Sequence, residues 1–439
     1  MSRPLPFPEL VEERLPNGAV AVAARRPGVP LAAVRLLVAA GAGLDPRGAF
    51  GLGNLAALAA HRGTRRRSGR KVDDAVESLG AELASGCDED ASWFGLSAPA
   101  EHLPRLLDLV VEVATEPSFP AAEVARLRRR ELAGLTHLLD DPGAVADRAI
   151  LSAVLGDHPY GHPPDGRAAH LRRLSRGAVA GFHRRWYAPA ATSLVVVGDV
   201  SPDEVLRLAR RRLGRWRPRA EAAPELPAPA AAARSVLVVD KPDLTQTQIR
   251  IGCSALPRRT PAYFAAVVAN AAFGGGFTSR LVDAIRVNRG LSYGVHSRFE
   301  MSRAGGTFSI SSFTKNESAA ELVEVALAEA RRFADGGPTD EELSRARAWL
   351  AGMFPLSLET HGQVADKIAD LRLYGTDVSE ITGYRERVAA VTAEECREVA
   401  RRHFPLDGGA IVAVGPARSV ARALERFGPV TVAAPEAMI

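Results

Sequence analysis

Residues 174–198 read LSRGAVAGFHRRWYAPAATSLVVVG, and residues 391–415 read VTAEECREVARRHFPLDGGAIVAVG. The two stretches align without a gap at an offset of 217 residues. Ser175 and Thr392 each precede an expected helix, where a hydroxyl can accept a hydrogen bond from a free backbone N–H group. A Val-rich segment typical of a strand follows each helix. The alignment therefore predicts one structural unit that occurs twice.

Two further segments repeat at nearly the same offset. FGLSAPAEHLPRLLDLVVEVA begins at Phe94, and FSISSFTKNESAAELVEVALAEA begins at Phe308. Both patterns predict a strand, a polar turn and an amphipathic helix. The chain is therefore expected to hold two copies of a unit of roughly 200 residues. We predict an N-terminal domain at 1–216, a Pro/Ala-rich linker at 217–235 and a C-terminal domain at 236–439.

Each predicted copy contains strand pairs followed by long helices. The pairs at 83–98 and 292–313 are joined by short polar turns, as in hairpins, and helices are expected at 121–139 and 338–357. Runs of strands followed by runs of helices indicate an α+β fold, with helices packed on a largely antiparallel sheet.

The composition excludes several classes of protein. The net charge of +5 is small for 439 residues, so it gives no reason to expect a nucleic-acid partner. Cys87, Cys253 and Cys396 lie too far apart for a zinc ribbon and are expected to be small buried side chains. No uncharged run of eighteen apolar residues predicts a membrane span, and no signal peptide is visible. We therefore expect a cytoplasmic protein without a membrane partner.

Four motifs identify a family. A GL…GT frame at 51–64, DDP at 140–142, HPYG at 158–161 and FGGGFTSRLVDAIRVNRGLSYGV at 273–295 resemble the M16 metallopeptidases, the group of insulin-degrading enzyme, pitrilysin and mitochondrial processing peptidase. The last motif is the most specific, and the resemblance extends over nearly the whole chain. It implies two tandem homologous M16-type domains that form half of a clamshell.

The resemblance also shows what the first domain lacks. Active members carry H-x-x-E-H on a helix, where two histidines bind zinc and the glutamate is the general base. In the frame GLGNLAALAAHRGT, Asn54 and Leu58 occupy the positions of the two histidines, and Ala57 occupies that of the glutamate. Alanine and leucine have no lone pair to offer a metal. The chain is therefore expected to bind no zinc and to cleave nothing alone.

No other residues are expected to rebuild the metal site. The family's third ligand, a glutamate upstream of DDP, aligns with Ala133 or Gly134, and Glu131 is two or three positions away, where a helix would point it elsewhere. His158 and His162 are the closest pair of histidines, but the prolines of HPYGHPP indicate a loop. A single further histidine, His61, does not make a zinc site.

The family's second catalytic element is present. The resemblance assigns an arginine and a tyrosine seven residues apart, here Arg286 and Tyr293, to substrate binding and catalysis. We expect Arg286 in the last turn of a helix that begins near Thr278, and Tyr293 at the start of the strand after Gly290. The guanidinium can hold peptide carbonyl groups and the phenol can donate to an oxyanion. The structural alternative is an arginine that favours the helix dipole and a tyrosine in the core.

Two other patterns have ordinary interpretations. The run Gly274–Gly276 lacks the GK[ST] of a phosphate loop and is expected to allow a close approach between helices. The basic run HRGTRRRSGRK at 61–71 has no interleaved aromatic residues, so a solvated loop is favoured over an RNA site. A charged wall of an inner chamber is a further interpretation of this run.

Together these observations predict the non-zinc-binding subunit of a heterodimeric M16 peptidase. Its partner would be a homologous H-x-x-E-H-bearing chain that holds the zinc, and its substrate an unfolded peptide. The alternative is a non-enzymatic scaffold or peptide-binding protein like the core subunits of respiratory complex III. An independent hydrolase is disfavoured because the chain has no GxSxG motif and no cysteine in a recognisable catalytic signature.

Overall fold

The computed structural model describes residues 7–217 and 220–439, which form two six-stranded sheets covered by helices. The first sheet has the order β1-β2-β6-β3-β5-β4 and the second the order β12-β7-β11-β8-β10-β9. The strands of the first sheet are β1 (Leu10–Arg14), β2 (Val20–Arg25), β3 (Leu31–Val38), β4 (Ala84–Cys87), β5 (Ser92–Pro99) and β6 (Thr192–Gly198). Those of the second are β7 (Ser235–Asp240), β8 (Gln246–Ala255), β9 (Val295–Met301), β10 (Gly306–Lys315), β11 (Ala410–Gly415) and β12 (Val430–Ala433).

Helices cover both sheets. Those of the N-terminal half are α1 (Leu52–Ala60), α2 (Gly69–Glu77), α3 (Leu103–Thr115), α4 (Ala121–Leu138), α5 (Pro142–Leu155), α6 (Ala168–Leu171), α7 (Arg176–Trp186) and α8 (Pro202–Arg212). Those of the C-terminal half are α9 (Tyr263–Asn270), α10 (Ala319–Gly336), α11 (Asp340–Met353), α12 (His361–Tyr374), α13 (Ser379–Thr382), α14 (Tyr384–Ala390), α15 (Ala393–His403) and α16 (Ala417–Leu424).

The two halves repeat the same architecture. In both sheets the central strands follow one order, with β2, β6, β3, β5 and β4 matched by β7, β11, β8, β10 and β9. Antiparallel pairings are the majority in each sheet, and β2–β6 and β7–β11 are parallel in both copies. The predicted α+β class and the largely antiparallel sheets are therefore confirmed.

Ser175 and Thr392 cap the N-termini of the repeated helix, as predicted from the sequence. Ser175 Oγ accepts from the backbone N–H of Ala178 at 3.1 Å, at the start of α7. Thr392 Oγ1 accepts from the backbone N–H of Glu395 at 3.2 Å, and the Glu395 carboxylate accepts from the Thr392 N–H at 2.7 Å. Both hydroxyls satisfy N–H groups that have no partner inside the helix.

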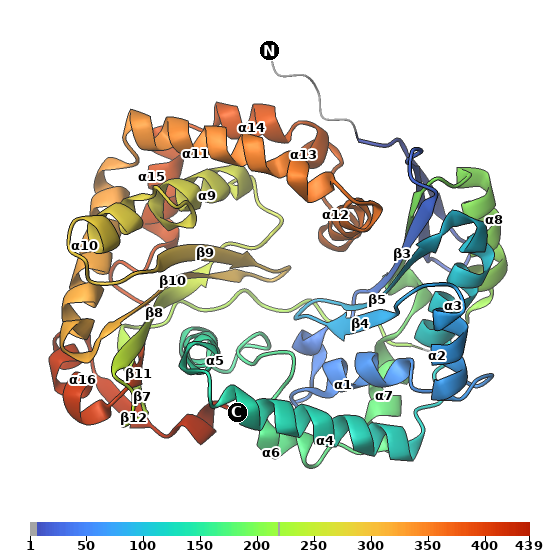
Figure 1. Cartoon of the computed structure of the whole chain (residues 1–439), viewed down its shortest axis with the longest axis horizontal. Helices are drawn as coiled ribbons and strands as arrows, with labels where there is room; N and C mark the ends of the chain where they lie inside the picture. Colours follow the sequence, from blue (N-terminus) through green and yellow to red (C-terminus); the bar gives the residue numbers. More distant parts are fainter. Residues whose placement is uncertain (1–6, 218–219) are drawn as a thin grey trace.

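The halves exchange one helix each. Helix α5 comes from the N-terminal half but packs on β8 and β11 of the second sheet, and α12 comes from the C-terminal half but packs on β3 and β6 of the first. Figure 1 shows orange α12 beside blue β3, and teal α5 beside the opposite sheet. Each exchanged helix buries an apolar face in a cluster shared with the other half. Each half therefore completes the hydrophobic packing of the other.

An arginine on each sheet forms an ion pair with an aspartate of the exchanged helix. On β8, Arg250 Nε donates to Asp147 Oδ1 of α5 at 2.6 Å, and its Nη2 donates to the carbonyl of Gly143 at 3.1 Å. On β3, Arg35 Nε donates to Asp366 Oδ1 of α12 at 2.6 Å. The two clamps occupy matching places in the repeat, because α12 corresponds to α5 and β8 to β3.

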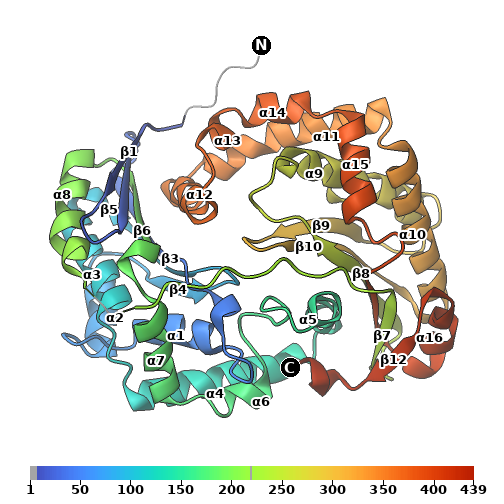
Figure 2. The ribbon, with the colours of Figure 1, turned by 180° about the vertical axis from the view of Figure 1, so that it is seen from behind.

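The connection between the halves is extended. Residues 220–234 contain no helix or strand, and Figure 2 shows this segment crossing from one half to β7 of the other. The domain boundaries at 1–216 and 236–439 remain a prediction from the sequence. Within residues 7–217 and 220–439, no helix is both long and apolar enough to cross a membrane.

Candidate functional site

Helix α1 keeps the frame of a zinc-binding helix without its ligands. The side chains at the three ligand and base positions are Asn54 and Leu58, which are half-buried, and Ala57, which is fully buried. The helix packs on α4, α7 and β4 through its apolar residues. Asp45 accepts hydrogen bonds from the backbone N–H groups of Gly51 and Gly53, both at 2.7 Å, and so caps its first turn. The frame is kept because it belongs to the core of the first half.

Neighbouring polar groups do not replace the missing ligands. His61 is buried and its Nδ1 lies 3.1 Å from Ser85 Oγ. Burial and the charges of Arg62 and Arg130 lower the pKa of His61 to about 4, so the ring is neutral at pH 7. Glu131 accepts two hydrogen bonds from the Arg130 guanidinium, at 2.9 and 3.1 Å, while Ala133 and Gly134 are exposed.

The histidine pair of HPYGHPP is used structurally. His158 and His162 lie in the loop between α5 and α6, as predicted. His158 Nε2 lies 2.8 Å from the carbonyl oxygen of Pro227, and the ring of His162 stacks on Phe50 with centroids 3.9 Å apart. Across the described part of the chain, no three His, Cys, Asp or Glu side chains gather as a metal-binding group. The donor set of α1 therefore does not fit zinc.

The second candidate element lies in the C-terminal half. Arg286 stands in a π-helical turn, Val282–Val287, which packs against α10 and β9. Gly290, with φ of +60°, ends this turn in a left-handed conformation that glycine adopts without strain. Arg286 therefore lies in the last turn of a helix, as expected, and that turn is widened to a π-helix. Such widened turns are frequent at functional sites.

Tyr293 is exposed to solvent on a loop that side-chain hydrogen bonds hold in place. It precedes β9 by two residues instead of opening it, and its side chain is 79% exposed, so the expectation of a strand position was wrong. The loop is held on both sides of the ring, since Thr314 Oγ1 donates to the carbonyl of Leu291 at 2.6 Å and Ser312 Oγ donates to that of Gly294 at 2.9 Å. A tyrosine in this position does not serve the core.

The Arg286 guanidinium lies between two aromatic rings. Its Cζ is 4.7 Å from the ring centroid of Phe277 and 4.8 Å from that of Tyr293. Phe277 is itself 75% exposed, an unusual position for a large apolar side chain. Two cation–π contacts hold the guanidinium in place and leave its N–H groups free, because it makes no hydrogen bond or ion pair with any described residue.

Phe277 was not predicted as a site residue from the sequence. Its position directly after the glycine run could have indicated that it lies in the same motif as Arg286. The missing side chain of Gly274 allows both a strand, β9, and a helical residue, Leu281, to pack closely against the glycine run. A Cβ atom at Gly274 would lie 2.5 Å from Ser297 Oγ on β9 and 2.8 Å from Leu281 Cδ1. Gly274 thereby lets the segment that carries Phe277 and Arg286 lie directly on β9. The expectation of an approach between helices was incomplete.

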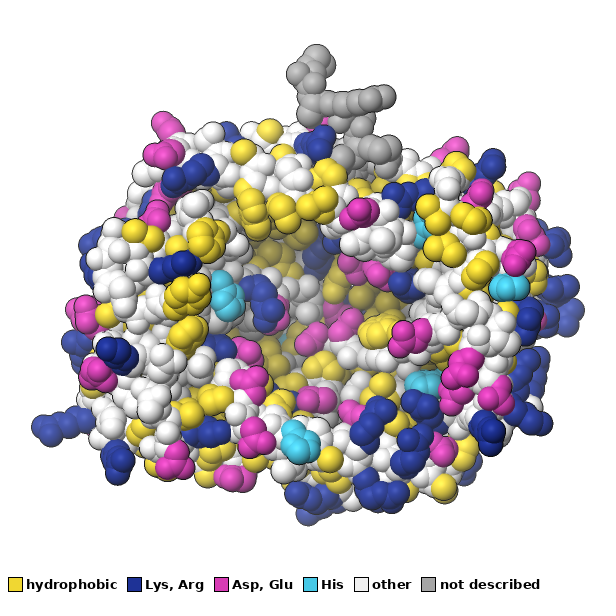
Figure 3. Space-filling view, in the orientation of Figure 1, with side chains coloured by type: hydrophobic (Ala, Val, Ile, Leu, Met, Phe, Trp, Pro, Cys, Tyr) yellow, Lys and Arg dark blue, Asp and Glu magenta, His cyan; other side chains and the backbone are white. Residues whose placement is uncertain are grey.

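The space between the halves is hollow and acidic. Figure 3 shows a depression in the centre of the molecule with acidic side chains around it. A cavity of about 570 Å³ lies there between β3, β4, β5 and α12, and Trp93, Asp88 and Asp370 line it. Burial raises the pKa of Asp88 to about 6 and also raises that of Asp370.

Comparison with known proteins agrees with this architecture. The model of "Insulinase (Peptidase family M16)" matches residues 20–163, and that of "Peptidase M16 inactive domain" matches residues 173–350. An uncharacterized zinc protease of Mycobacterium bovis is 27% identical over 405 residues, 92% of each chain. One of Streptomyces coelicolor is 26% identical over 345 residues, which cover 77% of this chain and 75% of the relative.

Solved structures share the fold over almost the whole chain. The crystal structure of a peptidase M16 inactive domain from Pseudomonas fluorescens has a TM-score of 0.86 and 26% identity, with 93% of this chain and 98% of that one covered. A protease from Helicobacter pylori has a TM-score of 0.87 at 19% identity, with 93% and 100% covered.

Fold and site together define a tandem α+β repeat protein whose first repeat lacks the donors of a zinc site. The two family models span almost all of residues 20–350: the first lies within the N-terminal half, and the second begins before α7 and continues into the C-terminal half. The chain belongs to peptidase family M16.

Proposed function

We propose that this chain is the non-zinc-binding subunit of a heterodimeric M16 peptidase. The partner is a homologous chain of similar size that carries H-x-x-E-H and holds the zinc. This chain contributes Arg286 and Tyr293 to a peptide held at the partner's metal. It is inactive alone and needs no cofactor of its own. The cytoplasmic location stays a prediction from the sequence.

The observation that carries the proposal is the exposed pair itself. An arginine with free donors, on a π-helical turn, and a tyrosine with a free hydroxyl, on a hydrogen-bonded loop, are presented side by side, and neither contributes to the core. A guanidinium offers several donors to peptide carbonyl oxygens. A phenol donates to the oxyanion that develops when a carbonyl is attacked. Groups of this kind assist a reaction whose metal and base are supplied from elsewhere.

The missing donors of α1 support the same division of roles. Asn54, Ala57 and Leu58 leave no general base and no set of metal ligands on that helix. The hollow between the halves gives an extended peptide room next to the chain. A single subunit of this kind completes a site only when a zinc-bearing homologue closes over it.

Mixing the purified chain with an H-x-x-E-H homologue from the same genome tests the proposal. We expect a stable 1:1 complex by light scattering and hydrolysis of unfolded peptides by the mixture alone, abolished by a chelator. Peptidase activity of this chain without the partner contradicts the proposal. A stable but inactive complex that binds peptide would instead support the scaffold alternative.

A further inference from the structure

A second cavity lies on the outer face of the N-terminal half. It has a volume of about 880 Å³, and its walls come from α3, α7, α8 and the turn before α4. These helices pack on one face of the first sheet, whereas α12 covers the other face, next to the central hollow. The cavity shares no residue with the Arg286 site and does not depend on the function proposed above. Its volume is typical of a small-molecule site.

The lining of this cavity has the same formal charge as the whole protein. Eight arginines and three carboxylates line it, which gives a formal charge of +5. The whole chain has the same net charge of +5, so the remaining residues are neutral in sum. His183 adds no charge at pH 7, because burial lowers its pKa to about 4. Figure 3 shows basic side chains along the edge of this half, on the right.

The three carboxylates of the lining are already neutralised. Each accepts hydrogen bonds from an arginine: Asp108 from Arg212, Glu116 from Arg66, and Glu112 from Arg67. Two more arginines are committed to the backbone. Arg176 donates to the carbonyls of Phe119 at 2.9 Å and Ser118 at 3.1 Å, and Arg217 donates to that of Trp216 at 3.0 Å. None of these groups can balance the remaining charge.

Four further arginines of the lining have neither an anion nor a backbone carbonyl as a partner. The side chains of Arg65, Arg184, Arg211 and Arg215 are exposed and make no hydrogen bond or ion pair with the described residues. They come from the basic run at 61–71, from α7 and from the end of α8. Like charges gathered around one cavity repel each other, so the arrangement lowers the stability of the free protein. An anion in the cavity would remove this repulsion.

We propose that this cavity binds a small anion with a chain of phosphates. Planar guanidinium groups match phosphate oxygens with paired hydrogen bonds, which makes arginine the preferred residue for such ligands. A half-open cavity of this volume fits a small molecule better than a nucleic-acid duplex, which needs a larger surface. Trp216, which is half-buried, gives part of the wall an apolar surface on which a nucleobase can stack. Inorganic polyphosphate and a nucleoside triphosphate share the chemistry that the arginines recognise.

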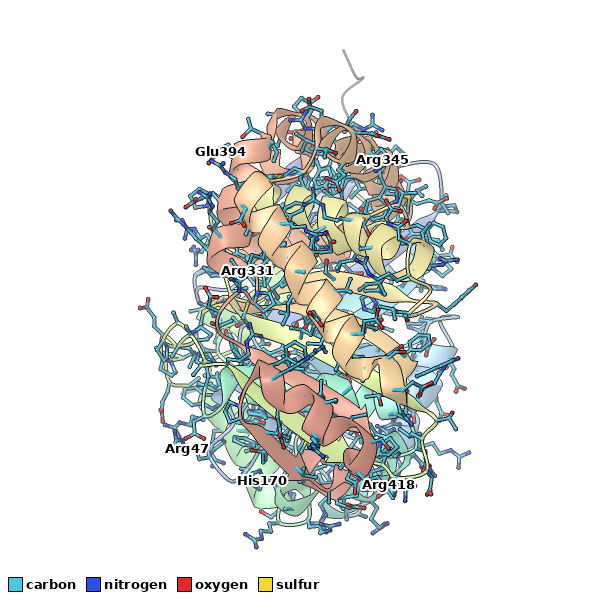
Figure 4. The ribbon with its side chains drawn as sticks, turned by 90° about the vertical axis from the view of Figure 1, so that its left-hand side faces the viewer. Arg47, His170, Arg331, Arg345, Glu394 and Arg418 are labelled. Carbon is cyan, nitrogen blue, oxygen red and sulfur yellow. The ribbon has the colours of Figure 1, made fainter. Side chains whose placement is uncertain are left out.

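Isothermal titration calorimetry on the full chain tests this site, with tripolyphosphate and ATP as the probes. The test variant is R184Q/R211Q, which removes two free charges of the cavity without breaking an ion pair. The matched control is R418Q/R422Q on α16, which also removes two exposed, unpaired charges. Figure 4 shows Arg418 on the outside of the C-terminal half. Both variants therefore have the same net charge.

We expect binding of tripolyphosphate to weaken roughly 10- to 100-fold in R184Q/R211Q, as two lost charge-assisted contacts imply, and little in the control. Tighter binding of ATP than of tripolyphosphate would assign the site to a nucleotide, and equal binding to inorganic polyphosphate. The proposal is overturned if neither anion binds, if both variants weaken binding equally, or if a DNA duplex binds more tightly than either probe.

Discussion

The Tyr293→Phe variant of the reconstituted pair should have a kcat about 100-fold below that of the wild type, the low end for one oxyanion donor. Its KM should change little, because the hydroxyl acts on charge that develops only in the transition state. The side chain is 79% exposed, so the loss of one oxygen removes no core packing. Phenylalanine also keeps a ring face for Arg286. Steady-state kinetics of the mixture measure the effect.

The melting temperature and mass of the complex are the controls for this prediction. Arg286→Lys, which keeps the charge but loses the planar fork, should instead raise KM. A purely structural pair would give the opposite pattern, with poor assembly and normal turnover in the complex that remains. Full activity in a well-folded Tyr293→Phe complex would remove the catalytic role and leave this chain as a lid.

Asp147→Ala should lower the free energy of unfolding by about 3 kcal/mol, roughly two orders of magnitude in the folding equilibrium. The substitution leaves Arg250, whose side chain is 8% exposed, without the carboxylate that balances its charge. The cost of a buried, unpaired charge exceeds the strength of the pair itself. Urea unfolding of the chain measures the difference.

Two matched variants distinguish the cost of an unpaired buried charge at Arg250 from the simple loss of one contact. Arg250→Met removes the buried charge together with the pair, so it should cost less than Asp147→Ala. Asp366→Ala, at the corresponding clamp, should also cost less, because Arg35 is 21% exposed and can be hydrated. A larger loss for Arg250→Met than for Asp147→Ala would contradict this account of the clamp.

The repeat was enough to predict the fold class, because its signals are local. Helix caps at Ser175 and Thr392 and the Val-rich strands after them depend only on neighbouring residues. The exchange of α5 and α12 was not predictable in this way. An apolar helix face indicates that the helix is buried, but it does not say which of two similar sheets covers it. That choice depends on contacts such as Arg250 with Asp147, more than 100 residues apart.

Of the candidate site, only the residues with a known role in the motif at 273–295 could be predicted from the sequence. The spacing of Arg286 and Tyr293 located the pair, but the π-helical turn and the second ring from Phe277 depend on how the segment packs on β9. The basic cavity was less visible still. The run at 61–71 was interpreted as a solvated loop, whereas α2 begins inside it at Gly69 and two of its arginines join others from α7 and α8. These arginines are far apart in the sequence, so their grouping around one cavity cannot be predicted from it.

Metal content tests the central claim most directly. Elemental analysis of the chain purified alone, and of its complex with the H-x-x-E-H homologue, reports which subunit holds zinc. The account predicts no stoichiometric zinc in this chain and one zinc per complex, because Asn54, Ala57 and Leu58 supply no ligand set. One tightly held zinc in the isolated chain would contradict it.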